Sequence, residues 1–169
     1  MTDRDPSGES AVIDCRNLWK IFGKRADEAM KAVREQGLGK LEVRDAFGCV
    51  VGVQDASFTV ARGEIFCIMG LSGSGKSTLI RHINRLIEPT SGQLFIEGQD
   101  VNALSARDLR GLRAEKIGMV FQNMALMPHR TVLENVSFSQ EVRGHDARAR
   151  RETALRAIDA VDLNGWDQK

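Results

Sequence analysis

The sequence contains no tyrosine, only three cysteines and only three prolines. The cysteines, Cys15, Cys49 and Cys67, are an odd number without paired spacing, so a disulfide framework is not expected. Reduced thiols of this kind fit a cytosolic compartment best. Cys67 falls inside an apolar run and is expected to be buried there.

Long apolar runs are also missing. No stretch approaches the roughly 20 apolar residues that a helix needs to cross a bilayer. The N-terminus, MTDRDPSGES, is polar and acidic and has no apolar core of a signal peptide. We therefore expect neither a transmembrane helix nor a signal peptide, and any association with a membrane would depend on a partner.

Neither sign of charge is in excess, because the chain has 24 basic and 23 acidic residues and a net charge of +1. The arginine-rich stretch over residues 143–156 is interleaved with Glu and Asp, which is typical of a solvated helix face. No nucleic-acid partner is expected. The length of 169 residues and the apolar share of 42% indicate one globular domain with a core.

The most specific motif that is present is GLSGSGKST over residues 70–78, which matches the G-x-x-x-x-G-K-[ST] pattern of a P-loop. Its glycines let successive backbone N–H groups point at phosphate oxygens, and a helix starting at about Ser77 adds its positive dipole end. Lys76 is expected to reach the β and γ phosphates, and the Ser77 hydroxyl to bind Mg²⁺. A Gly/Ser-rich surface loop is the alternative, but the order of apolar strand, motif and helix disfavours it.

Hydrophobic periodicity predicts an α/β chain after a disordered tail over residues 1–11. The runs over 64–69 and 117–121 are continuously apolar, as in strands of a parallel sheet that are buried on both faces. Ser105, Thr131 and Asp146 are predicted helix N-caps. The predicted strands cover 11–19, 50–60, 64–69, 93–96 and 117–121, and the predicted helices cover 27–37, 77–87, 106–114, 131–142 and 146–161.

Gln122 ends the predicted buried strand over 117–121 and leads into a loop. Its side-chain oxygen could contact Mg²⁺ or an attacking water. A polar residue that merely ends a strand is the alternative, and the P-loop together with the surrounding sequence favours the functional interpretation.

Two stretches resemble the nucleotide-binding subunit of ATP-binding cassette (ABC) transporters, namely GEIFCIMGLSGSGKSTLIRHINRLIEPTSGQLFIEGQDV and KIGMVFQNMALMPHRTVLENV. NLWKIFGK, EQGLGK and ALMPHRTVLENV resemble more narrowly the glycine betaine/proline importers, which take up quaternary amines. The resemblance covers residues 12–165. It implies an α/β P-loop NTPase with a parallel core sheet and flanking helices, an antiparallel β subdomain and the start of a helical subdomain. It divides 12–169 into an insertion over 24–49, a Q-loop and coupling region over 115–135 and a partial helical subdomain over 136–169.

The same resemblance implies an ATPase site for ATP and Mg²⁺. Gln122 matches the glutamine that senses Mg²⁺ and the γ-phosphate, and it joins Lys76 as a catalytic residue and Ser77 as a metal ligand. Phe22 matches the aromatic residue that stacks on adenine, with a core aromatic as the alternative. The residues implied to hold the nucleotide are Phe22, Gly70, Leu71, Ser72, Gly73, Ser74, Gly75, Lys76, Ser77 and Thr78.

Partners follow from the resemblance too. The segment over 125–131 matches the loop that docks a transmembrane permease subunit at the cytoplasmic face of the membrane. Met124, Leu126 and Met127 would be exposed anchors there, or else pack beneath the loop. A second nucleotide-binding subunit and, indirectly, a solute-binding protein are the other implied partners. His129 follows a proline and is expected to be structural, because the three histidines show no metal spacing.

The sequence does not contain the LSGGQ-type signature, the aspartate-glutamate pair or the switch histidine of the family. The carboxylate pair positions Mg²⁺ and the attacking water, so these 169 residues alone are expected to bind nucleotide weakly and hydrolyse it poorly. An unpaired strand edge would also make them marginally stable.

Three functions therefore stay open. The first is the ATP-binding subunit of an importer for glycine betaine, proline or a related solute. The second is a non-catalytic fragment that acts as a binding or regulatory partner, or the product of a decayed gene. A different P-loop enzyme, such as a small-molecule kinase, is disfavoured because nothing over 101–169 resembles a lid or an acceptor site.

Overall fold

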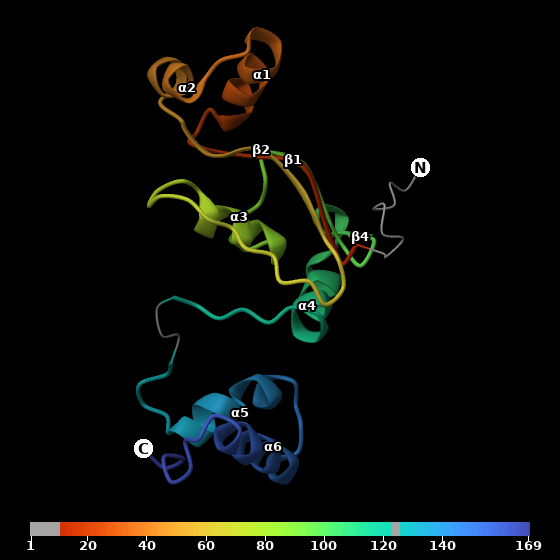
Figure 1. Ribbon diagram of the computed structural model, residues 1–169, viewed down its shortest axis with the longest axis vertical. Coiled ribbons are helices and arrows are strands. Elements are labelled where there is room, and N and C mark those ends of the chain that lie inside the picture. Colours follow the sequence, from red (N-terminus) through yellow and green to blue (C-terminus); the bar gives the residue numbers. More distant parts are fainter. Residues whose placement is uncertain (1–10, 123–125) are drawn as a thin grey trace. The chain divides into compact units, whose positions relative to one another are not determined.

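The computed structural model describes residues 11–122 and 126–169. They divide into a first unit that ends at Gly118 and a second unit that begins at Met119 (Figure 1). The tail predicted over residues 1–11 lies outside the described residues except for Ala11, and Met124 lies outside them too.

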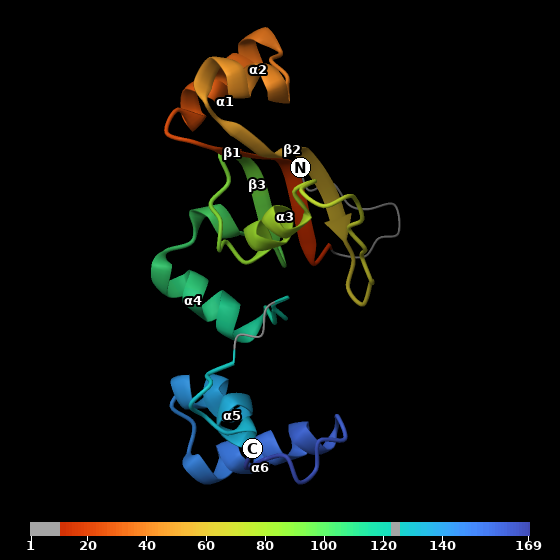
Figure 2. The ribbon, with the colours of Figure 1, turned by 90° about the vertical axis from the view of Figure 1, so that its left-hand side faces the viewer.

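The first unit is built on a four-stranded antiparallel sheet with the order β2-β1-β3-β4. Figure 2 shows β1, β2 and β3 side by side. The strands predicted over 11–19, 50–60 and 93–96 are confirmed with small shifts at their ends. The bounds are β1 (Ile13–Phe22), β2 (Val50–Val60), β3 (Ser91–Ile96) and β4 (Gln99–Asp100).

Helices of the first unit pack on this sheet and around its end. Leu109 and Leu112 of the helix that Ser105 caps join Leu18 and Leu94 of the sheet in one buried cluster. A second cluster lies where two short helices meet the end of β1, around Ile21. The bounds are α1 (Ala26–Gln36), α2 (Lys40–Phe47), α3 (Lys76–Ile83), η1 (Val101–Ala103) and α4 (Ala106–Glu115).

The helix predicted over 27–37 is confirmed as α1, but α2 was not predicted. Only Val43 of α2 is buried, so its eight residues carry little hydrophobic periodicity. Local signals define its ends instead. The Glu42 side chain accepts a hydrogen bond from the Gly39 backbone N–H at 2.6 Å, and Gly48 ends the helix at φ 63°.

The prediction of strands over 64–69 and 117–121 is wrong. Neither segment is a strand, and the residues Ile65 and Val120 are 90% and 98% exposed. Cys67, which was expected to be buried, is exposed as well. An apolar run becomes a strand only where neighbouring strands pair with its backbone groups, and no strand of the described residues pairs with either run.

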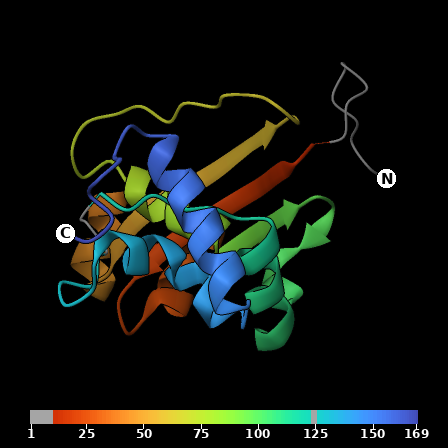
Figure 3. The ribbon, with the colours of Figure 1, turned by 90° about the horizontal axis from the view of Figure 1, so that it is seen from below.

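The second unit is a helical pair, α5 (Val132–Val142) and α6 (Ala147–Asp159), which pack against each other (Figure 3). Their N-caps are Thr131 and Asp146, as predicted, although α6 ends two residues earlier than expected. The buried residues are Leu133, Ala154 and Ile158. No helix in the described residues is long and apolar enough to cross a bilayer.

His82 is a buried histidine within α3. Its Nδ1 donates a hydrogen bond to the Thr78 carbonyl at 2.6 Å, while Nε2 has no partner within the described residues. Burial lowers the pKa of His82 below its ordinary value of 6.5, and nearby Lys20 acts in the same direction. The hydrogen bond to Thr78 and the charge of Glu88 oppose this shift without reversing it.

Because the pKa of His82 is lower in the folded state, the unfolded chain binds the proton at a higher pH. We expect the free energy of unfolding to fall as the pH drops below about 6.5. His82→Gln should flatten this dependence, whereas the exposed His145→Gln should retain it. Urea denaturation at a series of pH values measures the effect. An unchanged slope in His82→Gln would show that the dependence arises elsewhere.

Candidate functional site

The loop over residues 70–78 has the backbone geometry of an anion site. Gly70, Gly73 and Gly75 have φ angles of 153°, 77° and 96°, which residues other than glycine rarely adopt. No side chain caps α3, and its first backbone hydrogen bond runs from Leu79 N to Gly75 O at 2.8 Å. The N–H groups of residues 76–78 therefore have no partner within the helix and can meet an anion.

Lys76 curls back over this loop. Its Nζ donates to the carbonyl oxygens of Gly70 at 2.8 Å and Leu71 at 2.7 Å, and lies 3.4 Å from the Ser74 Oγ. These dipoles hold the ammonium group at the loop, where its charge adds to the positive end of α3.

The loop tolerates no side chain at Gly70. A Cβ built on Gly70 would lie 2.8 Å from the Ser74 Oγ, so any larger residue would crowd the loop. Ser77, in the first turn of α3, is exposed and carries a hydroxyl oxygen of the kind that Mg²⁺ accepts. The free backbone N–H groups, the Lys76 ammonium group and the Ser77 hydroxyl are of the kinds that a triphosphate and its metal ion bind, while the individual roles stay predictions.

Phe22, the last residue of β1, is 40% exposed. The Lys20 Nζ lies 5.1 Å from the centroid of this ring. An exposed aromatic face beside a cation suits a stacked base. The stacking role itself stays a prediction.

The prediction of the site missed Gly52, which lies in β2 between Phe22 and the P-loop. A Cβ at Gly52 would collide with the Phe22 ring, and a Cβ at Gly75 would collide with the Gly52 carbonyl oxygen. The available signal was a lone glycine inside a strand pattern, which often marks a bulge or a close backbone approach.

Gln122 belongs to the second unit, is exposed, and directly precedes residues 123–125, which lie outside the description. Its proposed contact with Mg²⁺ stays a prediction. Beyond the gap, Leu126 is exposed and Met127 is half-buried. His129 is exposed, and no cluster of metal-ligating residues occurs in the described parts of the chain.

Asn135 of α5 holds the loop over residues 126–131, and the sequence analysis did not single it out. Its Oδ1 accepts a hydrogen bond from the Met127 N–H at 2.8 Å. Its Nδ2 lies 3.0–3.2 Å from the carbonyl oxygens of Met127, Arg130 and Thr131. The Asn135 side chain thus supplies hydrogen-bond partners to backbone groups of a loop that has no regular secondary structure.

A sequence model of the family described as "ABC transporter" matches residues 53–169. The chain is 51% identical over 154 residues to the glycine betaine/proline betaine transport system ATP-binding protein ProV of Escherichia coli (strain K12), covering 91% of this chain and 38% of ProV. It is also 51% identical over 156 residues to the trimethylamine N-oxide transport system ATP-binding protein TmoW of Ruegeria pomeroyi, covering 92% of this chain and 45% of TmoW. The chain therefore spans less than half the length of these relatives.

Solved structures of ATP-binding cassettes are also similar to this chain. The dimeric ATP-binding cassette MJ0796, in a post-hydrolysis state bound to ADP and Pi, superposes with a TM-score of 0.72 at 27% identity. The similarity covers 93% of this chain and 61% of the MJ0796 chain. The fold is that of a P-loop NTPase cassette, as expected from the sequence, but the strands of the described residues form only an antiparallel sheet and not the expected parallel core sheet.

Replacing Asn135 by alanine should loosen the loop over 126–131. Several hydrogen bonds to half-buried backbone groups are lost, so the free energy of local opening should fall by about 1–3 kcal/mol. Amide hydrogen exchange at residues 126–131 measures this. Ser139→Ala, an exposed position on the same helix, is the matched control. Equal exchange rates in the two variants would contradict the role of Asn135.

Proposed function

The chain belongs to the ABC transporter family, and on that premise we propose that it is the ATP-binding part of an importer for glycine betaine, proline or a related compatible solute. In this role ATP binding and hydrolysis drive uptake. The proposal concerns the whole protein in which these residues act.

The observation that carries the proposal is the P-loop geometry. The positive-φ glycines, the uncapped start of α3 and the Lys76 ammonium group, which is bonded to the Gly70 carbonyl, belong to one short loop. A triphosphate supplies the several anionic oxygens that such a loop can bind. Lys76 would move from the Gly70 and Leu71 carbonyls to the phosphate oxygens, where it stabilises the charge that moves during transfer.

The remaining site residues complete the proposed binding mode. Ser77 would supply an oxygen to Mg²⁺, and Gln122 would contact the same ion or the γ-phosphate. The bound metal ion supplies charge neutralisation between the phosphate groups. Phe22 would stack on the adenine base, since its exposed ring belongs to the same unit as the P-loop.

The relatives' names support the proposed class of solute. ProV serves glycine betaine and proline betaine, and TmoW serves trimethylamine N-oxide. All three are small methylated amines, and the chain is equally similar to both relatives. Within the proposed class, a methylated amine such as glycine betaine is therefore favoured over proline, although this subunit itself would not touch the solute.

One proposed partner, a permease subunit, would dock through the loop that follows Gln122. Leu126 presents an exposed apolar side chain there, and Asn135 keeps residues 127–131 in a defined conformation. A permease subunit at the cytoplasmic face of the membrane would bind this loop. A second copy of the subunit would form the dimer, and a solute-binding protein would act indirectly.

Lys76→Ala tests the nucleotide site. Loss of a charged donor to the phosphates should weaken ATP binding by about 10²-fold. Calorimetric titration with ATP and Mg²⁺ measures the affinity in the intact protein. Lys40→Ala, an exposed lysine at the start of α2, removes the same charge away from the site and should bind ATP normally. The proposal fails if both variants bind ATP equally well.

A further inference from the structure

A β-bulge interrupts the pairing of β1 with β2 beside the P-loop. Lys20 pairs with Val53, while the next residue, Ile21, pairs with Val51. Gly52 is therefore the extra residue on β2. A bulge bends its strand and redirects neighbouring side chains, which is why bulges are common next to functional sites.

Because Gly52 has no side chain, the Phe22 ring can lie directly against its backbone. A Cβ at position 52 would lie 2.6 Å from Cε2 and 3.1 Å from Cδ2 of that ring. The same point is 3.6 Å from the Cγ2 of Thr78, in the first turn of α3. The aromatic ring and the end of the P-loop thus meet at Gly52.

The backbone of Gly52 touches the P-loop as well. Its carbonyl oxygen approaches Gly75 so closely that a Cβ on Gly75 would overlap it. One residue of β2 therefore contacts both the ring that is proposed to stack on a base and the loop that is proposed to hold phosphates.

We propose that Gly52 is a positioning residue that places the Phe22 ring at the correct distance from the P-loop. A nucleoside triphosphate can then engage the ring with its base and the loop with its phosphates at the same time. This inference rests on the function proposed above and adds the residue that joins the two halves of the site.

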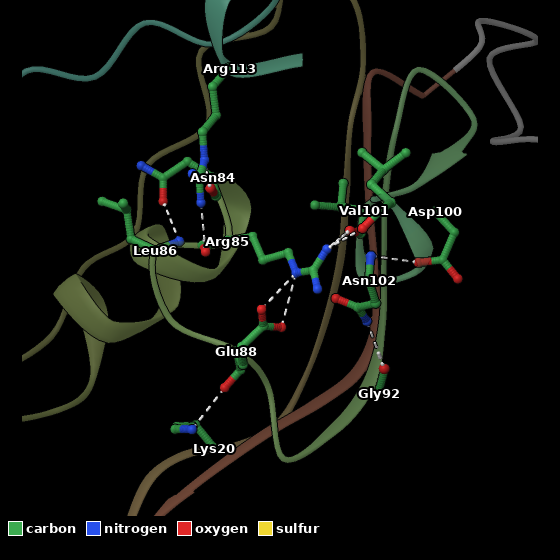
Figure 4. Close-up of polar contacts among 11 residues, drawn as sticks. Lys20, Asn84, Arg85, Leu86, Glu88, Gly92, Asp100, Val101, Asn102 and Arg113 are labelled. Carbon is green, nitrogen blue, oxygen red and sulfur yellow. Dashed lines mark hydrogen bonds and ion pairs between the residues drawn. The ribbon is translucent and has the colours of Figure 1, made fainter. Parts of the chain in front are cut away.

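A methyl group at position 52 should move the ring and leave the fold intact. Gly52 is not among the residues with positive φ, so alanine can adopt its backbone conformation. The ring of Phe22 is partly exposed and can turn outward. Figure 4 shows that Lys20, whose ammonium group lies near this ring, donates to the Glu88 carbonyl at 2.8 Å, so the cation is anchored independently of position 52.

The first experiment compares two ligands in the intact protein, ATP with Mg²⁺ and inorganic tripolyphosphate with Mg²⁺. Gly52→Ala should weaken ATP binding by about tenfold, the range of a lost base–aromatic stack, and leave tripolyphosphate binding unchanged. Gly111→Ala is the matched control, because a Cβ at Gly111 meets nothing within 4 Å. Unchanged tripolyphosphate binding also shows that the substituted protein is folded.

The second experiment tests whether Gly52 acts through the ring. Once Phe22→Ala has removed the ring, adding Gly52→Ala should have no further effect on ATP affinity. This double-mutant cycle separates a positioning role from a general structural one.

Each outcome gives a decision. If Gly52→Ala weakens both ligands equally, leaves ATP binding unchanged, or acts equally with and without the ring, the inference is overturned while the nucleotide site stands. If the unsubstituted protein binds neither ligand, the proposed function fails and the inference fails with it.

Discussion

The close approach of the Gly75 backbone to the Gly52 carbonyl oxygen is the constraint on which the candidate site depends. It attaches the end of the P-loop to the antiparallel sheet at a point where neither residue has a side chain. From there α3 runs across the sheet, and its Leu79 and Ile83 pack against the core around Leu18. The phosphate loop is therefore held by ordinary burial of apolar surface as well as by its own glycines.

The opposite end of α3 is held by two arginines, as Figure 4 shows. Arg113 of α4 donates to the carbonyl oxygens of Asn84 and Arg85, both at 2.8 Å. Arg85 in turn donates to the carbonyl oxygens of Val101 and Leu104 at 3.1 and 2.9 Å. Positive guanidinium groups suit the negative end of a helix. Arg113 thus binds the carbonyls at and just beyond the C-cap of α3, and Arg85 ties this end to the segment around η1, while the positive N-terminal end is left open to an anion.

Much of this arrangement could be predicted from the sequence, because the decisive signals are local. The P-loop glycines, the caps Ser105, Thr131 and Asp146 and the alternation over 50–60 depend on a few neighbouring residues. The prediction of strands over 64–69 and 117–121 failed because a strand needs neighbouring strands from other parts of the chain to pair with it. The described residues supply none for these two segments. Gly52 was missed because its importance lies in contacts with Phe22 and Gly75, some 20 to 30 positions away along the chain, which no local pattern reveals.

The central claim is that the aromatic ring and the phosphate loop form one nucleotide site. The most direct measurement records the NMR signals of the Phe22 ring and of the backbone amides of residues 73–78 in the intact protein, first with ATP and Mg²⁺ and then with inorganic tripolyphosphate and Mg²⁺. The account predicts that the loop amides shift with both ligands and that the ring signals shift with ATP alone, because only ATP brings a base to stack on it. Ring signals that do not respond to ATP, or that respond equally to tripolyphosphate, would contradict it.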